Sequence, residues 1–395
     1  MERCDLLVIG AGVVGLTAAR AFARRHPGQR VVVLDKEPEV GRHASGRNSG
    51  VLHAGFYYDA DSLKARFSRD GNRALADYCE EHALPLRRCG KLVVPRDAAE
   101  LPALDALAAR GANGVRLEAV SAEEAQRIEP RVRAHERALW SPDTAVVSPQ
   151  AVCAQLAREL GELGVTLRTS TPFRGRDGEA VLAGDDRIEA GAVLNCAGAF
   201  ADRVAAGWGA GEAYQLVPFR GLYLLADPAT ASLACCVYPV PPSDMPFLGV
   251  HLTVTVEGTV KIGPTATPAR WREDYGGLAG LRWRDVAEQL RIQPRLLRRN
   301  ALFRRHAVSE LSKRSAWVLV REASRLVDGL PALRSWKWGR PGIRAQLVER
   351  ASGALVGDFV VERAERSLHV LNAVSPAFTC SLPFAEHLVD LLEAA

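Results

Sequence analysis

Three glycines near the start of the chain have the types and spacing to cradle a diphosphate. Gly10, Gly12 and Gly15 form a G-x-G-x-x-G pattern. The first glycine of this pattern permits a tight turn, the second lets the backbone approach the diphosphate, and the third lets a helix pack closely on a strand. Asp35, twenty residues after Gly15, is placed to accept hydrogen bonds from a ribose. These residues predict a bound dinucleotide, and the alternative is an ordinary packing turn between a strand and a helix.

The elements that must position these residues are two strands and a helix. Residues 6–9 (LLVI) and 31–34 (VVVL) are short apolar runs typical of strands buried in a parallel sheet. Between them, residues 14–25 predict a helix that begins at Val14 and directs its free N–H groups at the diphosphate. The strand–helix–strand order predicts an α/β fold of the Rossmann type. Lys36, next to Asp35, is a further candidate cofactor contact.

A segment rich in small and polar residues follows the second strand. Residues 41–58 carry many hydrogen-bond donors, and their glycines permit close approach to a ligand. A connection just past a strand of an open α/β sheet lies beside the carboxyl ends of the strands, where such sheets bind ligands. We therefore expect cofactor contacts from Ser45, Arg47, Asn48, Ser49 and Gly50.

Three later segments are expected to return to the same edge. Residues 192–203 predict a buried strand that runs through a turn of small residues into a helix, and residues 340–346 lead back toward the first domain. Residues 367–371 predict a strand, followed by a Ser-Pro turn into the last helix, whose N-terminus would place positive charge beside the cofactor. The candidate cofactor contacts in these segments are Ala197, Gly198, Gly342, Ser375, Pro376 and Ala377.

The rest of the chain predicts a second domain interleaved with the first. We expect helices over residues 61–82, 98–109, 122–128 and 148–163, and short strands of an antiparallel flap at 165–167 and 181–182. Strand-like runs at 221–225, 249–256 and 259–263 predict an antiparallel sheet that covers the cofactor, and residues 91–94 predict a strand of an inserted piece that extends to Trp140. The predicted cofactor domain comprises 1–85, 145–213 and 336–395, and the predicted substrate domain comprises 86–144 and 214–335.

Composition narrows the class of protein. The chain has 395 residues and a net charge of +5, and no apolar run approaches the roughly 20 residues that span a bilayer. Its eight cysteines include no C-x-x-C pair, which favours buried free thiols over a metal site. Eight arginines between Arg282 and His306 could face an anionic membrane, a partner or simply solvent. We expect a cytoplasmic protein with no nucleic-acid partner, and leave open a peripheral contact with the inner face of a membrane.

The identity of the dinucleotide follows from what else the chain contains. The glycines at 207, 209 and 211 have the wrong spacing for a second nucleotide fingerprint, which disfavours a reductase that uses NAD(P)H. The Gly-Asp pair that aromatic hydroxylases place near the flavin is absent before the last helix. A fingerprint that opens the chain, and a chain that returns to it at the end, favour FAD over the NAD of a plain dehydrogenase. We therefore expect a small-molecule substrate that reduces a flavin directly.

Longer motifs carry a resemblance to a known family. They are residues 48–58 (NSGVLHAGFYY), 62–65 (SLKA), 89–92 (CGKL), 217–221 (VPFRG), 245–251 (MPFLGVH), 342–346 (GIRAQ) and 372–377 (NAVSPA). With the glycine fingerprint, they make the chain similar to the FAD-dependent L-2-hydroxyglutarate oxidase/dehydrogenase family, among the D-amino-acid-oxidase-like flavoproteins. The resemblance covers nearly the whole chain. It implies oxidation of a 2-hydroxy acid to the 2-oxo acid, with hydride transfer to flavin N5.

That reaction needs a base for the hydroxyl proton and cations for the carboxylates. The ordinary imidazole pKa, about 6.5, lies near working pH, so His53 and His251 are the candidate bases. The alternatives are that His53 orients or covalently tethers the flavin and that His251 is a hydrogen-bonded core residue. Candidate substrate-binding residues are Tyr57, Lys64, Arg220 and Arg344, with Lys261 behind them, and each basic one could instead form a structural salt bridge.

Some positions depart from the pattern of the resembled family. Its members carry Glu, Arg and Asn where this chain has Leu222, Val254 and Thr265, and a small residue at Phe378. We expect Val254 and Thr265 to lie near the substrate, so the substrate could have changed to another hydroxy acid, an amino acid, an amine or a sugar alcohol. Oxygen and a quinone are both left open as the electron acceptor, and a flavin-binding module without turnover is the alternative from another class.

Overall fold

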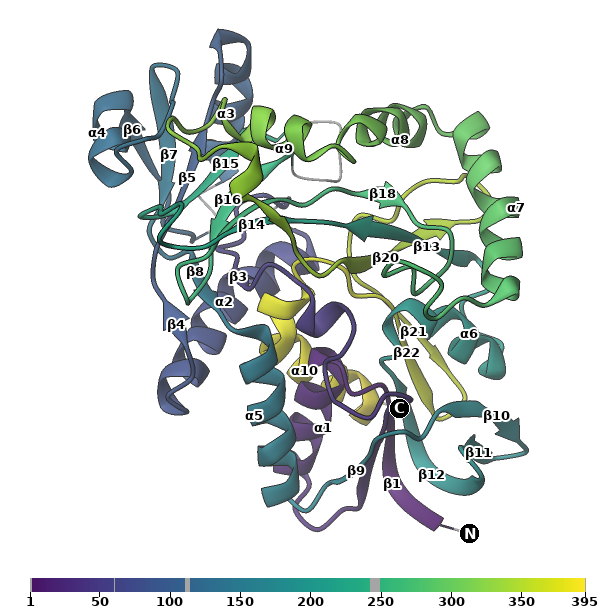
Figure 1. Cartoon of the computed structure of the whole chain (residues 1–395). Coiled ribbons are helices and arrows are strands. Elements are labelled where there is room, and N and C mark those ends of the chain that lie inside the picture. The colour runs from purple at the N-terminus through teal and green to yellow at the C-terminus, as the bar shows by residue number, and fades with distance from the viewer. Residues whose placement is uncertain (1, 60, 111–113, 242–248, 395) are drawn as a thin grey trace.

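A parallel sheet organises the N-terminal and C-terminal parts of the chain. The computed structural model describes residues 2–59, 61–110, 114–241 and 249–394. Five strands lie parallel in the order β9, β2, β1, β12 and β22 (Figure 1). Two further strands pair antiparallel with members of this group, β11 with β12 and β21 with β22. The strands are β1 (Glu2–Ile9), β2 (Val31–Leu34), β9 (Thr166–Arg168), β10 (Phe173–Asp177), β11 (Ala180–Ala183), β12 (Asp186–Asn195), β21 (Val360–Ala364) and β22 (Ser367–Asn372).

Three helices cover one face of this sheet, and a fourth packs on one of them. The helices α1 (Val13–Arg25), α2 (Leu63–Glu81), α5 (Pro149–Glu162) and α10 (Ala377–Glu393) share one apolar core with the sheet, and α1, α5 and α10 run side by side in Figure 1. Strand β1 is buried over its last four residues because its apolar run is covered on both faces. The opposite face packs against a smaller cluster that includes Val204 of the short helix α6 (Ala201–Ala205).

The covering part of the molecule contains two of the remaining sheets, and the third packs on α2. An eight-stranded sheet has the order β19, β14, β17, β16, β15, β5, β7 and β6, and most of its pairs are antiparallel. Two three-stranded sheets have the orders β18–β13–β20 and β3–β8–β4. The strands of the large sheet are β5 (Lys91–Val94), β6 (Glu118–Ser121), β7 (Arg137–Ser141), β14 (Leu224–Ala226), β15 (Cys236–Pro239), β16 (His251–Val254), β17 (Val260–Gly263) and β19 (Lys337–Trp338).

The sheet β18–β13–β20 and the outer helices complete the covering part, whereas the sheet β3–β8–β4 packs on α2. In Figure 1 the helices α7, α8 and α9 lie along the outer border of the molecule, on the side away from β1. No helix in the described part of the chain has the length and apolar character to cross a membrane. The elements are β3 (Val51–Leu52), β4 (Leu86–Arg87), β8 (Ala145–Val147), β13 (Tyr214–Gly221), β18 (Thr267–Pro268), β20 (Gly342–Glu349), α3 (Leu101–Ala109), α4 (Ala122–Ile128), α7 (Trp283–Arg299), α8 (Ala301–Ser312) and α9 (Ala316–Ala323).

The expected α/β architecture is confirmed, with three local corrections. The strand predicted at 165–167 is not part of an antiparallel flap, because β9 pairs parallel with β2 and extends the main sheet. The run predicted at 221–225 is two strands, since β13 ends at Gly221 and β14 begins at Leu224. The segment expected to lead back to the first domain forms β20, which pairs along its length with β13 of the covering part. Ser62 is the N-cap of α2.

Candidate active site

The glycine turn has the shape that a diphosphate needs. Gly10 has a φ of +111°, and a Cβ there would lie 2.5 Å from the carbonyl oxygen of Cys196. A Cβ on Gly15 would lie 1.9 Å from the Gly10 oxygen, so a larger residue would push α1 away from the turn. Gly12 caps α1, and the first turn of this helix contains no acidic residue that would repel an anion. The cradle therefore fits the diphosphate of FAD.

The residues around this turn are held in place by the segment that follows β2. The Asp35 carboxylate accepts hydrogen bonds from the backbone N–H groups of Ala11, at 2.7 Å, and of Glu37, at 2.9 Å. The Ser45 hydroxyl accepts one from the Val13 N–H at 2.9 Å. Asn48 donates to the Ser45 carbonyl at 2.7 Å and so closes the turn. This segment thus positions polar groups beside the N-terminus of α1.

One cavity of about 1930 Å³ joins most of the predicted site residues. It runs past the carboxyl ends of β1, β2, β12 and β22, because residues that follow each of these strands line it. The predicted residues that line it are Gly10, Gly12, Val14, Asp35, Lys36, Ser45, Arg47, Asn48, Ser49, His53, Tyr57, Lys64, Ala197, Gly198, His251, Gly342, Arg344, Ser375, Pro376 and Ala377.

Four candidate residues lie outside that lining: Gly15, Gly50, Arg220 and Lys261. Gly15 and Gly50 allow close packing of the backbone and do not face the cavity. A Cβ on Gly50 would lie 2.5 Å from the Val147 carbonyl oxygen. Arg220 has its Nη1 atom 3.8 Å from the Asp274 carboxylate. The backbone also approaches closely at Gly342, where a Cβ would lie 2.6 Å from the Arg47 carbonyl oxygen.

The N-terminus of α10 opens into the cavity beside His53. Ser375 and Pro376 line the cavity. Pro376 is the N-cap of α10, which begins at Ala377. The first turn of α10 has no acidic residue. Thr379 of this turn accepts a hydrogen bond from the His53 N–H at 3.2 Å and donates one to the Val51 carbonyl. The helix thereby positions His53 and presents a positive dipole end to the cavity.

Both candidate bases are neutral imidazoles. Burial lowers the pKa of His53 to about 3 and that of His251 to about 3. His251 lies 2.8 Å from the Gly249 carbonyl through Nδ1, so Nδ1 carries the proton and Nε2 keeps its lone pair. The His251 ring stacks on Tyr238 with 3.8 Å between centroids. The Nδ1 atom of His53 is buried without a hydrogen-bond partner among the described residues. Both rings can therefore accept a proton.

Two cations meet at the same end of the cavity. Lys64, at the start of α2, is 4 % exposed, and burial together with the charge of Arg344 lowers its pKa to about 7. Burial likewise lowers the pKa of Arg344 to about 10, although Tyr58 opposes this shift. The Tyr57 hydroxyl at this end is buried without a partner in the described part of the chain. Buried cations of this kind favour a carboxylate ligand.

The positions that depart from the resembled family divide into two groups. Thr265 and Phe378 line the cavity, and the Thr265 hydroxyl accepts a hydrogen bond from the Leu222 N–H at 3.0 Å. The expectation for Val254 is wrong, because its side chain is fully buried in the apolar core of the large sheet. A change of residue at 254 therefore says nothing about the substrate. Residues 245–248 of one resembling motif lie outside the described residues.

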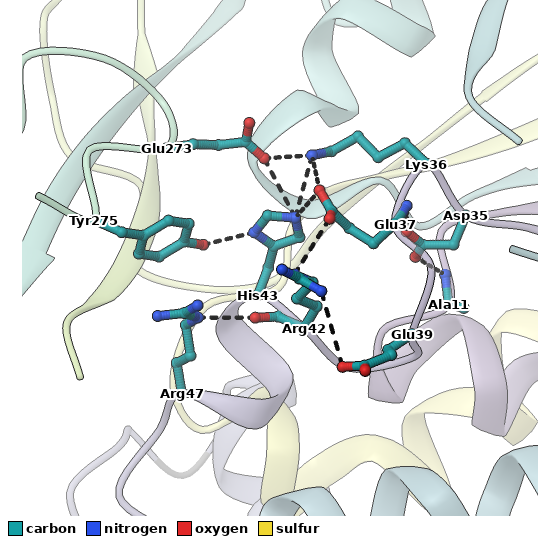
Figure 2. A network of polar contacts seen from close by, with 10 residues as sticks. All are labelled: Ala11, Asp35, Lys36, Glu37, Glu39, Arg42, His43, Arg47, Glu273 and Tyr275. Carbon is teal, nitrogen blue, oxygen red and sulfur yellow. Dashed lines mark hydrogen bonds and ion pairs between the residues drawn. The ribbon is translucent and has the colours of Figure 1, made fainter. Parts of the chain in front are cut away.

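A network of polar contacts closes the nucleotide end of the cavity (Figure 2). Lys36 pairs with Glu37 at 2.7 Å and with Glu273, which comes from the covering part. His43 lies 2.7 Å from the Tyr275 hydroxyl through Nδ1. Glu37, His43 and Glu273 are close enough to hold a metal ion, but the Lys36 ammonium already lies among them. Although burial opposes ionisation, Lys36 and His43 lower the pKa of Glu37 to about 2.

Glu273→Gln should make the protein release FAD roughly threefold to tenfold faster, because it removes one carboxylate from this closing contact. Release is measured as the rise of flavin fluorescence after dilution. Glu39→Gln is the matched control, since Glu39 is in the same segment, is exposed and only approaches Arg42 at 3.9 Å. Equal release rates for the two variants would contradict a closing role for Glu273.

The sequence alone did not indicate most residues of the polar network at the nucleotide end, or the tyrosines that line the cavity. Glu37 stands next to Lys36 and could have been noticed, whereas Glu273 and Tyr275 come from an irregular segment more than 200 residues away. Tyr58, Tyr223 and Tyr238 also line the cavity. No local pattern marks these residues, because their positions depend on long-range packing between the two parts of the chain.

Comparison with known proteins agrees with this geometry. A profile of the FAD dependent oxidoreductase family matches residues 5–391. The mitochondrial L-2-hydroxyglutarate dehydrogenase of Mus musculus is 35% identical over 410 aligned positions, which cover 97% of this chain and 87% of that protein. The L-2-hydroxyglutarate dehydrogenase of Escherichia coli is 32% identical over 404 positions, covering 98% and 93%.

Solved structures share the fold at lower identity. The dithionite-reduced L-α-glycerophosphate oxidase of Mycoplasma pneumoniae, with FAD bound, has a TM-score of 0.80 at 20% identity and covers 100% of this chain and 95% of its own. Glycine oxidase of Geobacillus kaustophilus has a TM-score of 0.72 at 20% identity, with coverage of 100% and 95%. The chain therefore belongs to the FAD-dependent oxidoreductases and, within them, to the family of the L-2-hydroxyglutarate dehydrogenases.

Proposed function

We propose that this enzyme oxidises L-2-hydroxyglutarate, or a closely related 2-hydroxy dicarboxylate, to the 2-oxo acid. The observation that carries the proposal is the meeting of Lys64 and Arg344 with two neutral histidines in one cavity. A carboxylate group suits the two cations, and a hydroxyl proton suits a neutral imidazole. The relatives named above as dehydrogenases of L-2-hydroxyglutarate support the same substrate.

In this mechanism the protein residues bind, orient and deprotonate the substrate. Bound FAD supplies the acceptor for the hydride that leaves the substrate carbon. Arg344 provides a planar fork for one carboxylate, and Lys64 adds a second positive charge. The lone pair on Nε2 of His251 accepts the hydroxyl proton, because its Nδ1 is already bonded to the Gly249 carbonyl. The N-terminus of α10 stabilises negative charge in the cavity.

An amino-acid, amine or sugar-alcohol substrate is not favoured. Glycine oxidase shares the fold with this chain, but its 20% identity carries no information on substrate. The deciding test is steady-state turnover with a dye acceptor, comparing L-2-hydroxyglutarate with its D-enantiomer, L-glutamate and glycerol 3-phosphate. We expect kcat/KM to be highest for L-2-hydroxyglutarate. Faster turnover of the amine or of the phosphate ester would reject the proposed substrate.

We further propose that the enzyme docks on an anionic membrane through α7 and α8. Trp283 and Leu290 on α7 are 77% and 70% exposed, and their spacing places them on one side of the helix. Exposed arginines at 284, 291 and 295 border this stripe. On α8, Val308 and Leu311 are 62% and 57% exposed. Exposed apolar side chains beside arginines suit the interface of a bilayer that contains acidic lipids.

Trp283→Ser combined with Leu290→Ser should reduce binding to vesicles at least fivefold, since it removes the two most exposed apolar groups of α7. Binding is measured by sedimentation with vesicles of phosphatidylcholine containing one third phosphatidylglycerol. Leu163→Ser, at an exposed position after α5, is the control. Unchanged sedimentation of the double variant, or equal binding to vesicles without phosphatidylglycerol, would contradict this surface.

We propose the cytoplasm as the compartment and a membrane quinone, in place of oxygen, as the electron acceptor. All eight cysteines are free, and six of them are buried, as is typical of a reducing compartment. A docked enzyme would meet a quinone in the bilayer directly. Reoxidation of the reduced enzyme by a soluble quinone analogue should therefore be faster than reoxidation by dissolved oxygen. The reverse order of rates would reject the quinone.

A further inference from the structure

A lysine that the proposed mechanism does not use is buried behind the wall of the cavity. Lys91, the first residue of β5, has no exposed surface, and its Nζ atom has no hydrogen-bond partner in the described part of the chain. No carboxylate pairs with it there. Burying an ammonium without a counter-ion is costly, and proteins retain such groups mostly at functional sites. Lys91 is therefore a candidate for a role beyond packing.

Three aromatic rings surround the ammonium. Nζ lies 4.5 Å from the ring centroids of Phe56 and Tyr57 and 5.0 Å from that of Tyr238. Contacts of this kind stabilise a cation through the negative face of the ring, but each is weaker than an ion pair with a carboxylate. Tyr57 and Tyr238 line the cavity, whereas Phe56 belongs to the core. The charge thus lies one side chain away from the substrate.

The same charge acts on both candidate bases. After burial, Lys91 is the main charge that lowers the pKa of His53, and it also lowers that of His251. Tyr238 connects the two groups physically, because it stacks on His251 on one side and contacts the ammonium on the other. The titratable groups that face Lys91 are Cys89, Cys236, His53, His251, Tyr57 and Tyr238.

We propose that Lys91 is a positioning residue for the oxidation, whose uncompensated charge behind the cavity wall stabilises the negative charge that develops as the substrate hydroxyl loses its proton. This inference rests on the proposed function of the cavity. Hydroxyl deprotonation places negative charge in a site with little water, where a fixed positive charge at short range has a large effect. The lysine does so without touching the substrate.

The test compares a variant that lacks the positive charge with one that keeps it. Lys91→Met keeps the length of the side chain and removes the charge, while Lys91→Arg keeps the charge at every accessible pH. The rate constant for anaerobic flavin reduction by L-2-hydroxyglutarate is measured between pH 6 and 9. We expect the methionine variant to be at least tenfold slower, with unchanged FAD retention and equal or higher thermal stability, because an apolar group replaces an unpaired buried charge.

The pH profile separates this role from packing. Burial lowers the pKa of Lys91 to about 7, so its charge is lost as pH rises, and bound anionic substrate shifts that loss upward. At saturating substrate, where the bound carboxylate holds Lys64 charged, the parental rate should therefore fall at alkaline pH, whereas the arginine variant should lack this fall. Parental rates and profile in the methionine variant would overturn the proposal. Lys91→Gln replaces the methionine variant if that protein does not fold. Absence of reduction in the parental enzyme would instead overturn the proposed function.

Discussion

His251→Ala should slow the reduction of bound flavin by L-2-hydroxyglutarate about 10²-fold to 10⁴-fold, the usual contribution of a general base. We assign the base to His251 because the Gly249 carbonyl fixes its tautomer and Tyr238 fixes its ring. His53→Ala should cost less than tenfold. The measurement is anaerobic stopped-flow absorbance of the flavin. Since the pKa of both histidines is about 3, the parental rate should not fall between pH 8 and 5 with a midpoint near 6.5.

His135→Ala is the control for this comparison, because His135 is half-buried, lies outside the lining of the cavity and contacts Glu136. A large loss in the His53 variant with none in the His251 variant would reverse the assignment. Parental rates in both variants would remove histidine from the proton transfer altogether.

Arg344→Met should raise KM for L-2-hydroxyglutarate about 30-fold to 100-fold, because a charge-assisted bidentate contact with a carboxylate is lost. Arg344→Lys should recover part of the loss, since lysine keeps the charge but not the planar fork. The measurement is steady-state kinetics together with the spectral change of the flavin on binding of 2-oxoglutarate. Lys64, whose pKa is lowered by burial and by the charge of Arg344, keeps its own positive charge in both variants.

Arg220→Met is the matched control for this experiment. Arg220 is on the neighbouring strand β13, where Nη1 faces Asp274, and it does not line the cavity in the described structure. We expect its KM to change less than threefold. If the Arg220 variant lost substrate binding and the Arg344 variant kept it, the carboxylate site would have to be moved to β13.

The sequence predicted the elements whose signals are local. The glycine spacing and two apolar runs were sufficient for the turn between β1 and α1, because each position there has a steric reason that sequence alone expresses. Ser62 could be named as a cap for the same kind of reason. Strand β9 was misplaced because three residues with one apolar position do not indicate their partner strand.

Contacts between segments that lie far apart in the chain could not be predicted from the sequence. Glu273 reaches Lys36 only because an irregular segment of the covering part lies over the segment after β2, as Figure 2 shows. Lys91 appeared in a family-like motif, but a single lysine in a strand indicates an exposed position, and its burial depends on rings from two distant segments, Phe56 and Tyr57 in one and Tyr238 in the other. The prediction for Val254 was wrong for the opposite reason. Its strand lies next to the site, but its side chain is packed in the apolar core of the large sheet.

On this mechanism, a 2-hydroxy dicarboxylate held by Arg344 and Lys64 reduces bound FAD directly. Its most direct test is to mix the FAD-loaded protein anaerobically with L-2-hydroxyglutarate and record the visible spectrum. The account predicts complete bleaching of the flavin with saturating dependence on substrate and formation of one equivalent of 2-oxoglutarate. A flavin that stays oxidised with L-2-hydroxyglutarate but is bleached by an amino acid or an amine would contradict it.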